Sequence, residues 1–142
     1  MVPGSKLAEA ARAAWAAPCS LLGLLLALPL LAMGARAGRV AGTLEVAFDE
    51  IAAVPVKLAR WPFCAITFGH VILGATHAQL DQVRRHERVH VRQYGRWGVV
   101  FLLAYPLSSM LQLLRGKDPY WHNRFEVEAR ALDESASGGP PA

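Results

Sequence analysis

The residues whose types and spacing could do chemistry are His86, Glu87 and His90, which form the motif His-Glu-x-x-His. Residues four apart lie on one face of an α-helix, so both imidazoles can reach the same metal ion. Two imidazoles and one further protein ligand hold catalytic zinc with a coordination position open for water. Glu87, beside the first ligand, is then placed to take a proton from that water. The motif therefore predicts a zinc-dependent hydrolase in which Glu87 is the general base.

A catalytic zinc usually takes three protein ligands, so the chain must supply one more. The extended metzincin pattern, with glycine and a third histidine after the motif, is excluded because Gln93 and Arg96 stand at those positions. A glutamate on a later helix is the other common solution, and we predict Glu126. The alternatives for this ligand are Glu128, His122 and Asp118.

The sequence around the motif predicts an amphipathic helix. Thr76 is a suitable N-cap, with Gln79 at the capping-box position. Apolar and motif residues recur at helical spacing, which places both histidines on or beside an inward stripe. The stripe consists of Leu80, Val83, Glu87, His90, Tyr94 and Trp97. Another face carries Arg84, Arg88, Arg92 and Arg96. We expect this arginine row to be solvated or to contact phosphates of a membrane surface.

Composition points to a membrane protein with one domain. The 142 residues suffice for one hydrophobic core and are too few for two domains of ordinary size. Hydrophobic residues make up 54% of the chain against 18% charged residues, and they are gathered in blocks. The net charge of +4 suits anionic lipid headgroups, and no nucleic-acid motif accompanies it, so we expect no nucleic-acid partner. We predict neither a disulfide nor a zinc site from Cys19 and Cys64.

Two uncharged apolar stretches are long enough to cross a membrane. Residues 13 to 35 can span it as a retained helix, and a secretory signal peptide cleaved near Ala35-Arg36-Ala37 is the alternative. Residues 97 to 114 are just long enough to span, and a buried core helix is the alternative.

Charge and the metal site together constrain the topology. The loop between the two stretches carries most of the arginines, and the positive-inside rule places it, with the metal site, on the cytoplasmic side. Two full spans would put Glu126 on the opposite side of the bilayer from His86 and His90. We therefore expect the second stretch to turn back at Pro106 as a hairpin within one leaflet.

The remaining segments predict a small β element and one more helix. Residues 43 to 48 alternate as a short strand does. The β-rich run 63 to 74 predicts a second strand, with a helical hairpin as the alternative, and Gly69 marks a bulge or a close approach of backbone. Residues 120 to 132 predict a short amphipathic helix, and residues 133 to 142 predict a disordered tail.

These elements resemble the gluzincin branch of zinc metallopeptidases, in particular the small membrane-bound kind related to heat-shock and CAAX-processing endopeptidases. In those families a strand precedes the His-Glu-x-x-His helix, and a later helix carries a segment Glu-x-x-Ala-Asp, which Glu126-Val127-Glu128-Ala129-Arg130 resembles. The resemblance implies that Glu126 is a zinc ligand and that residues 63 to 74 form an edge strand which pairs with an extended peptide substrate. Arg130 stands where the family often has an aspartate that orients a ligating histidine.

We therefore predict a mainly α fold with a small β element in a reduced zincin-like arrangement. Residues 1 to 37 form the N-terminal transmembrane helix, residues 38 to 132 the metal-binding domain that includes segment 97 to 114, and residues 133 to 142 the tail. The predicted function is a membrane-bound zinc hydrolase that cleaves peptides or proteins. Its predicted site consists of the metal ligands His86, His90 and Glu126 and the catalytic base Glu87.

Two other functions are compatible with the sequence. One is a non-catalytic membrane protein whose arginine-rich helix binds anionic lipid or an acidic partner. The other is a structural zinc site with a closed fourth position, supplied by His122 or His70.

Overall fold

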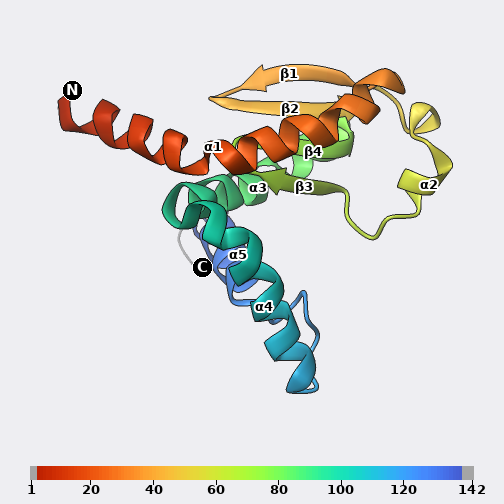
Figure 1. Ribbon diagram of the computed structural model, residues 1–142. Helices are drawn as coiled ribbons and strands as arrows, with labels where there is room; N and C mark the ends of the chain where they lie inside the picture. The colour runs from red at the N-terminus through yellow and green to blue at the C-terminus, as the bar shows by residue number, and fades with distance from the viewer. Residues whose placement is uncertain (1–2, 139–142) are drawn as a thin grey trace.

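A small four-stranded sheet lies between two long helices in the computed structural model, which describes residues 3 to 138 (Figure 1). Helix α1 (Pro3–Ala32) runs along one face of the sheet, and helix α3 (His77–Trp97) packs on the other. Helix α4 (Phe101–Leu114) extends away from the sheet, and helix α5 (Arg124–Ser137) returns beside α3. The mainly helical fold with a small β element is confirmed.

The sheet consists of β1 (Arg36–Val40), β2 (Thr43–Phe48), β3 (Ala65–Phe68) and β4 (Val71–Thr76) in the order β1-β2-β4-β3. Strand β4 pairs in parallel with β2 and antiparallel with β3, so β3 is an edge strand. A 3₁₀ turn (Ile51–Ala53) and the short helix α2 (Val56–Ala59) connect β2 to β3. The strand predicted for residues 43 to 48 is confirmed.

The single strand predicted for residues 63 to 74 is wrong, because this run folds into the β3–β4 hairpin. Gly69 in the turn has a φ of +60°, which a residue with a side chain rarely adopts. The turn also touches α1, since the His70 backbone N–H donates to the Ser20 hydroxyl at 2.9 Å. The predicted close approach of backbone at Gly69 is therefore confirmed.

Helix α3 begins at the predicted N-cap, where the Thr76 hydroxyl accepts a hydrogen bond from the Gln79 N–H at 3.2 Å. Leu80, Glu87, His90 and Tyr94 of the predicted inward stripe are buried. The arginine row differs from the prediction at its first member. Arg84 is half-buried and makes two hydrogen bonds, of 2.7 and 2.8 Å, to the buried Glu45 carboxylate on β2. This ion pair fastens α3 to the sheet, because a buried carboxylate needs a paired cation.

The hairpin predicted at Pro106 is also wrong. Helix α4 continues through Pro106 to Leu114, and the chain turns afterwards, where Gly116 has a φ of +68°. A proline costs a helix one hydrogen bond without forcing a reversal, and apolar helices tolerate it. In the turn, the Asp118 carboxylate accepts from the N–H groups of Tyr120 and Trp121.

The predicted tail is helical in its first part. Helix α5 extends to Ser137, so only residues 139 to 142 of that prediction lie outside the described residues. The predicted start of this helix was too early, because Asn123 caps it by accepting from the Phe125 N–H at 3.0 Å. Phe125 and Ala129 are buried as expected, whereas Leu132 is 42% exposed.

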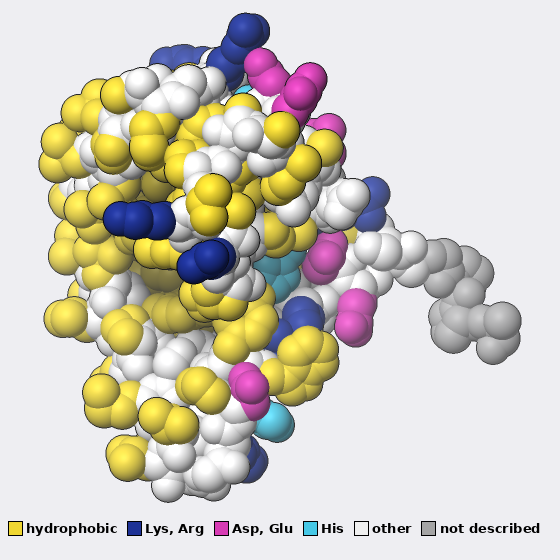
Figure 2. All heavy atoms as spheres, turned by 90° about the vertical axis from the view of Figure 1, so that its right-hand side faces the viewer, with side chains coloured by type: hydrophobic (Ala, Val, Ile, Leu, Met, Phe, Trp, Pro, Cys, Tyr) yellow, Lys and Arg dark blue, Asp and Glu magenta, His cyan; other side chains and the backbone are white. Residues whose placement is uncertain are grey.

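Two helical segments, Lys6–Ala32 and His77–Leu114, are long and apolar enough to cross a membrane. Both carry leucines that point away from the protein. On α1 these include Leu21, Leu25 and Leu28, and on α4 they include Leu103, Leu107 and Leu113. Figure 2 shows hydrophobic side chains along the left side of the molecule from top to bottom. The buried core helix considered for residues 97 to 114 does not describe α4, which leaves most of its leucines exposed.

The contact between the hairpin and α1 is testable at Gly69. A Cβ atom there would lie 2.6 Å from the Ser20 backbone nitrogen, and the positive φ adds strain. We expect Gly69→Ala to lower the free energy of unfolding by about 2–4 kcal/mol, measured by denaturant unfolding of the purified protein. Gly38→Ala is the matched control, because nothing lies within 4 Å of its added Cβ, and equal loss in both variants would contradict this packing.

The return of the chain after α4 predicts that the start of α3 and the body of α5 lie on the same side of a membrane. A cysteine introduced at the exposed position Gln82 or Glu134, in a Cys64→Ser background that keeps the buried Cys19, should react with an impermeant maleimide from the same side. Labelling from opposite sides would mean that Glu126 does not share a site with His86.

Candidate metal centre

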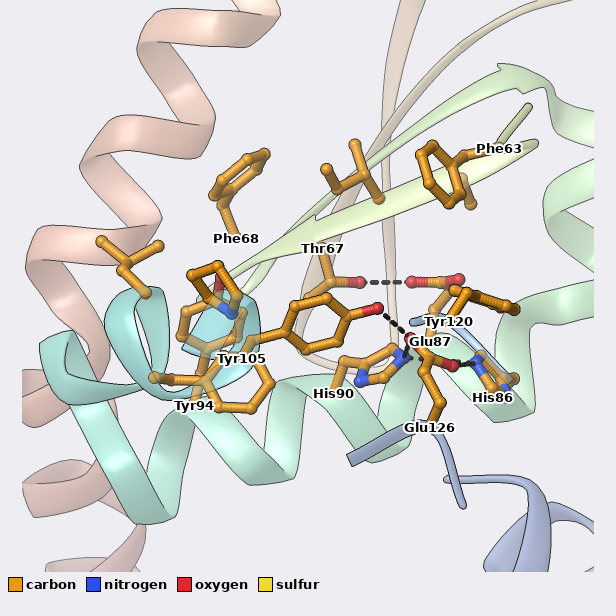
Figure 3. Close-up of a pocket in the computed structure, with 15 residues that line it drawn as sticks. Phe63, Thr67, Phe68, His86, Glu87, His90, Tyr94, Tyr105, Tyr120 and Glu126 are labelled. Carbon is orange, nitrogen blue, oxygen red and sulfur yellow. Dashed lines mark hydrogen bonds and ion pairs between the residues drawn. The ribbon is translucent and has the colours of Figure 1, made fainter. Parts of the chain in front are cut away.

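Two helices bring three potential metal ligands together. His86 and His90 project from α3, and Glu126 projects from the first turn of α5, which packs against α3 (Figure 3). The Nε2 atoms of the two histidines are 3.2 Å apart. The Glu126 carboxylate places Oε2 3.0 Å from His86 Nε2 and Oε1 3.3 Å from His90 Nε2. The structure therefore assembles the three residues predicted as ligands.

These spacings fit one metal ion. In a tetrahedral site with bonds of about 2.0–2.1 Å, neighbouring ligand atoms are roughly 3.3 Å apart. The three ligand atoms all lie within 4.8 Å of one another. Within residues 3 to 138, the other residues considered as ligands do not belong to this group. These residues are His70, Asp118, His122 and Glu128.

The start of α5 fixes the position of Glu126. The buried Asn123 side chain caps α5 and also donates to the Tyr105 carbonyl at 3.1 Å and to the Ser109 hydroxyl at 2.7 Å. Phe125 is buried against Phe101, with ring centroids 4.9 Å apart. Asn123 thus acts as the N-cap, while the Glu126 carboxylate contacts the histidines instead of taking part in the cap.

Gln93 orients one of the two histidines, a role that the sequence analysis missed. Its amide nitrogen donates to the Phe125 carbonyl at 3.0 Å and to the Glu128 carboxylate at 2.9 Å. Both of these partners only accept, so the Gln93 amide oxygen is the atom that faces His90 Nδ1 at 2.8 Å. His90 therefore carries its proton on Nδ1. In the neutral ring this leaves the Nε2 lone pair directed at Glu126 and His86.

Glu126 adds a negatively charged carboxylate to the two imidazole rings of His86 and His90. Burial raises the pKa of the Glu126 carboxyl, but hydrogen bonds with His86, His90 and Tyr105 outweigh burial and hold it well below its usual range. Glu126 is consequently a carboxylate at neutral pH. The Tyr105 hydroxyl on α4 donates to its Oε1 at 2.5 Å. The Glu126 Oε1 atom and the His90 Nε2 atom, 3.3 Å apart, can share one cation between them, which is either a proton carried by Nε2 or a metal ion bound by both atoms.

Glu87 lies next to this group and is held by the sheet. Its side chain is buried, and its Oε2 accepts a hydrogen bond from the Thr67 hydroxyl on β3 at 2.7 Å. Figure 3 shows Thr67 pointing from the strand toward Glu87. The bond keeps the carboxylate at the wall of the cavity described next.

A cavity of about 280 Å³ lies between β3 and α4 and contains the site. His86, Glu87, His90 and Glu126 line one part of it, and the rest is mainly aromatic and aliphatic. Figure 2 shows the hollow from outside, with a histidine side chain visible beside it. Tyr120 also borders the cavity, and burial together with the nearby Glu126 charge raises the pKa of Tyr120 to about 12. Its hydroxyl therefore keeps its proton at neutral pH. His122 is exposed and does not line the cavity.

Comparisons with protein-family models, with curated proteins and with solved structures found no match for this chain.

The geometry predicts that the purified protein binds one divalent metal ion. His86→Ala, His90→Ala and Glu126→Ala each remove a ligand and should lower the affinity by more than about 100-fold, measured by competition with a chelating indicator. Gln93→Ala should weaken binding by about 10- to 100-fold, because it frees the His90 ring. Glu87→Gln is the control and should retain the ion. A wild-type protein with no bound metal, or ligand variants that bind as wild type does, would contradict the site.

Proposed function

We propose that this protein is a membrane-bound, zinc-dependent hydrolase, most specifically a peptidase. One observation carries the proposal. Two imidazole nitrogens and a carboxylate oxygen are directed at one point inside a cavity, and the carboxylate of Glu87 stands beside them. Two histidines, one glutamate and an open position make up a common ligand set of catalytic zinc. The described part of the chain offers no fourth side chain, which speaks against a closed structural site.

Zinc is the ion that this ligand set favours, because imidazole nitrogen suits it better than it suits the harder calcium or magnesium ions. Held by His86, His90 and Glu126, zinc would polarise a scissile carbonyl and acidify the attacking water. The resemblance to gluzincins, which the arrangement of an edge strand, the motif helix and a later glutamate helix supports, leads to the same ion.

The protein residues then have separate tasks. Glu87 takes the proton of the attacking water, and the Thr67 hydroxyl keeps its carboxylate in place. Gln93 holds His90 in the tautomer that can bind a metal. Tyr120, which retains its proton, can donate a hydrogen bond to the oxygen on which negative charge develops.

The apolar surface supports attachment to a membrane. Exposed leucines on α1 and α4 would be unfavourable in water and suit hydrocarbon instead. We further propose that the metal site faces the cytoplasm, since the segment between the two apolar stretches is rich in arginine.

The alternative of a non-catalytic lipid-binding helix receives less support. Arg84, one of its four aligned arginines, is paired with Glu45 and Asp81 instead of facing solvent alone. Arg88 is half-buried, which leaves Arg92 and Arg96 as the exposed members of the row.

Hydrolysis tests the proposal through Glu87. The zinc-loaded wild type should cleave a mixture of internally quenched peptides, and Glu87→Gln should lower the rate by about 10²- to 10⁴-fold with its zinc retained. Glu134→Gln, at an exposed position on α5, is the matched control and should cleave as wild type does. Equal rates for Glu87→Gln and wild type would rule out this mechanism, and so would full activity after removal of zinc.

A further inference from the structure

The edge of β3 borders a second cavity, on the opposite face of the sheet from the metal centre. Its volume is about 240 Å³, and residues of α1, α2 and β4 line it together with β3. The wall is apolar, with Leu30 from α1, Leu58 from α2 and Ala75 after Leu73 on β4. The metal-centre cavity and this second cavity share Phe63, Ala65, Ile66 and Phe68, so they meet along one strand.

Alternation along β3 directs its side chains to two faces of the sheet, and both cavities extend to the open edge of this strand. Thr67 points to α3, where it binds Glu87, so its neighbours Ile66 and Phe68 point to the α1 face. Phe68 indeed packs with Ala27 and Leu30 of α1. The metal centre therefore lies on one face of the strand and the second cavity on the other.

The free edge of β3 offers backbone groups between the cavities. The Cys64 carbonyl accepts from the Ala75 N–H at 3.0 Å, so in this antiparallel pair Cys64, Ile66 and Phe68 direct their backbone groups toward β4. The N–H and C=O groups of Ala65 and Thr67 alternate with these and point to the open edge. Within the described chain, β3 pairs with β4 and with no other strand. Unpaired backbone groups select an extended peptide over an acyl chain.

We infer that the second cavity is a specificity subsite for an apolar side chain of a peptide substrate that adds to the β3 edge. This inference rests on the proposed function. Consecutive residues of an added strand point to opposite faces, so one side chain enters the metal-centre cavity and the next enters the second cavity. The preferred substrate then has two adjacent apolar residues. A segment with apolar residues at every second position fills one cavity and leaves the other empty.

Spacing of leucines in a binding probe tests this without catalysis. Fluorescein-labelled nonapeptides of Gly, Ser and Thr would carry Leu-Leu, Leu-Ser-Leu or a single Leu at the centre. They would be titrated by anisotropy against the full-length Glu87→Gln protein in nanodiscs. Burial of one more leucine predicts that Leu-Leu binds roughly tenfold or more tightly than the other two peptides.

A variant that fills the second cavity should remove this advantage. In Ala75→Leu, the Leu-Leu and single-Leu peptides should bind within about twofold of each other, while the single-Leu peptide keeps its wild-type affinity, which shows that the variant is folded. Leu58→Trp fills the same cavity from α2 and should also abolish the advantage of the Leu-Leu peptide. This variant replaces Ala75→Leu in the test if Ala75→Leu does not fold. Gly38→Ala, remote from both cavities, should change nothing.

Several results would overturn the inference. These are equal binding of Leu-Leu and Leu-Ser-Leu, an unchanged advantage in both cavity-filling variants, or binding of lauric acid with no binding of any peptide. The proposed function fails separately. If peptides obey the spacing rule but the zinc-loaded wild type cleaves none, the chain binds peptides without hydrolysing them. If the zinc-loaded wild type cleaves peptides whatever the spacing of their leucines, the proposed hydrolase function is supported and the proposed second subsite is wrong.

Discussion

The junction that Asn123 makes between α4 and α5 is the interaction on which the candidate metal centre depends. Asn123 is fully buried, and its amide group caps α5 while it donates two hydrogen bonds to α4. Three residues later along α5, the Glu126 carboxylate meets the histidines of α3. An unpaired buried amide would cost about 1–3 kcal/mol, so the junction allows few other orientations of α5. The Asn123 side chain, which does not belong to the His86, His90 and Glu126 group, thereby determines where Glu126 lies.

Hydrogen bonds connect the group of His86, His90 and Glu126 to residues that pack α3 against α5. Gln93 connects His90 to the Phe125 carbonyl and to Glu128, so the ring of one ligand and the helix that carries another are held by a single amide. A carboxylate often holds a metal-binding histidine in this way, but Arg130 stands where the resemblance to gluzincins led us to expect an aspartate. In this structure the hydrogen bond to the His90 ring comes instead from Gln93, which lies three residues after His90 on α3. A neutral amide fixes the tautomer without adding further negative charge to a buried site that already holds Glu126 and Glu87.

Features that depend on local residue types and spacing could be predicted from the sequence, whereas features that depend on contacts between residues far apart in the chain could not. The Thr76 cap, the inward stripe of α3 and strand β2 follow from residue type and periodicity. Glu126 could be predicted to join the two histidines as well, because the zinc site expected from the motif needs a third protein ligand. Nothing in the sequence indicated that Gln93 orients His90; it showed only that Gln93 does not fit the metzincin pattern. This role depends on a hydrogen bond to the Phe125 carbonyl, 32 positions away. The turn at Pro106 was mispredicted because proline permits both a continuing helix and a reversal, and residue type alone does not distinguish them.

Helix α1 forms one layer of the core and is also one of the two helical segments long and apolar enough to cross a membrane. One face of α1 carries only small residues, at Ala16, Cys19, Gly23 and Ala27, all of them buried. A Cβ at Gly23 would lie 2.7 Å from the Cβ of Val71, which shows how closely the helix approaches β4. Cleavage near Ala37 would uncover the core residues that Ala27 and Leu30 contact, together with the α1 wall of the second cavity. The opposite face of α1 is rich in exposed leucine, so the same helix contributes small residues to the core and large apolar residues to the surface.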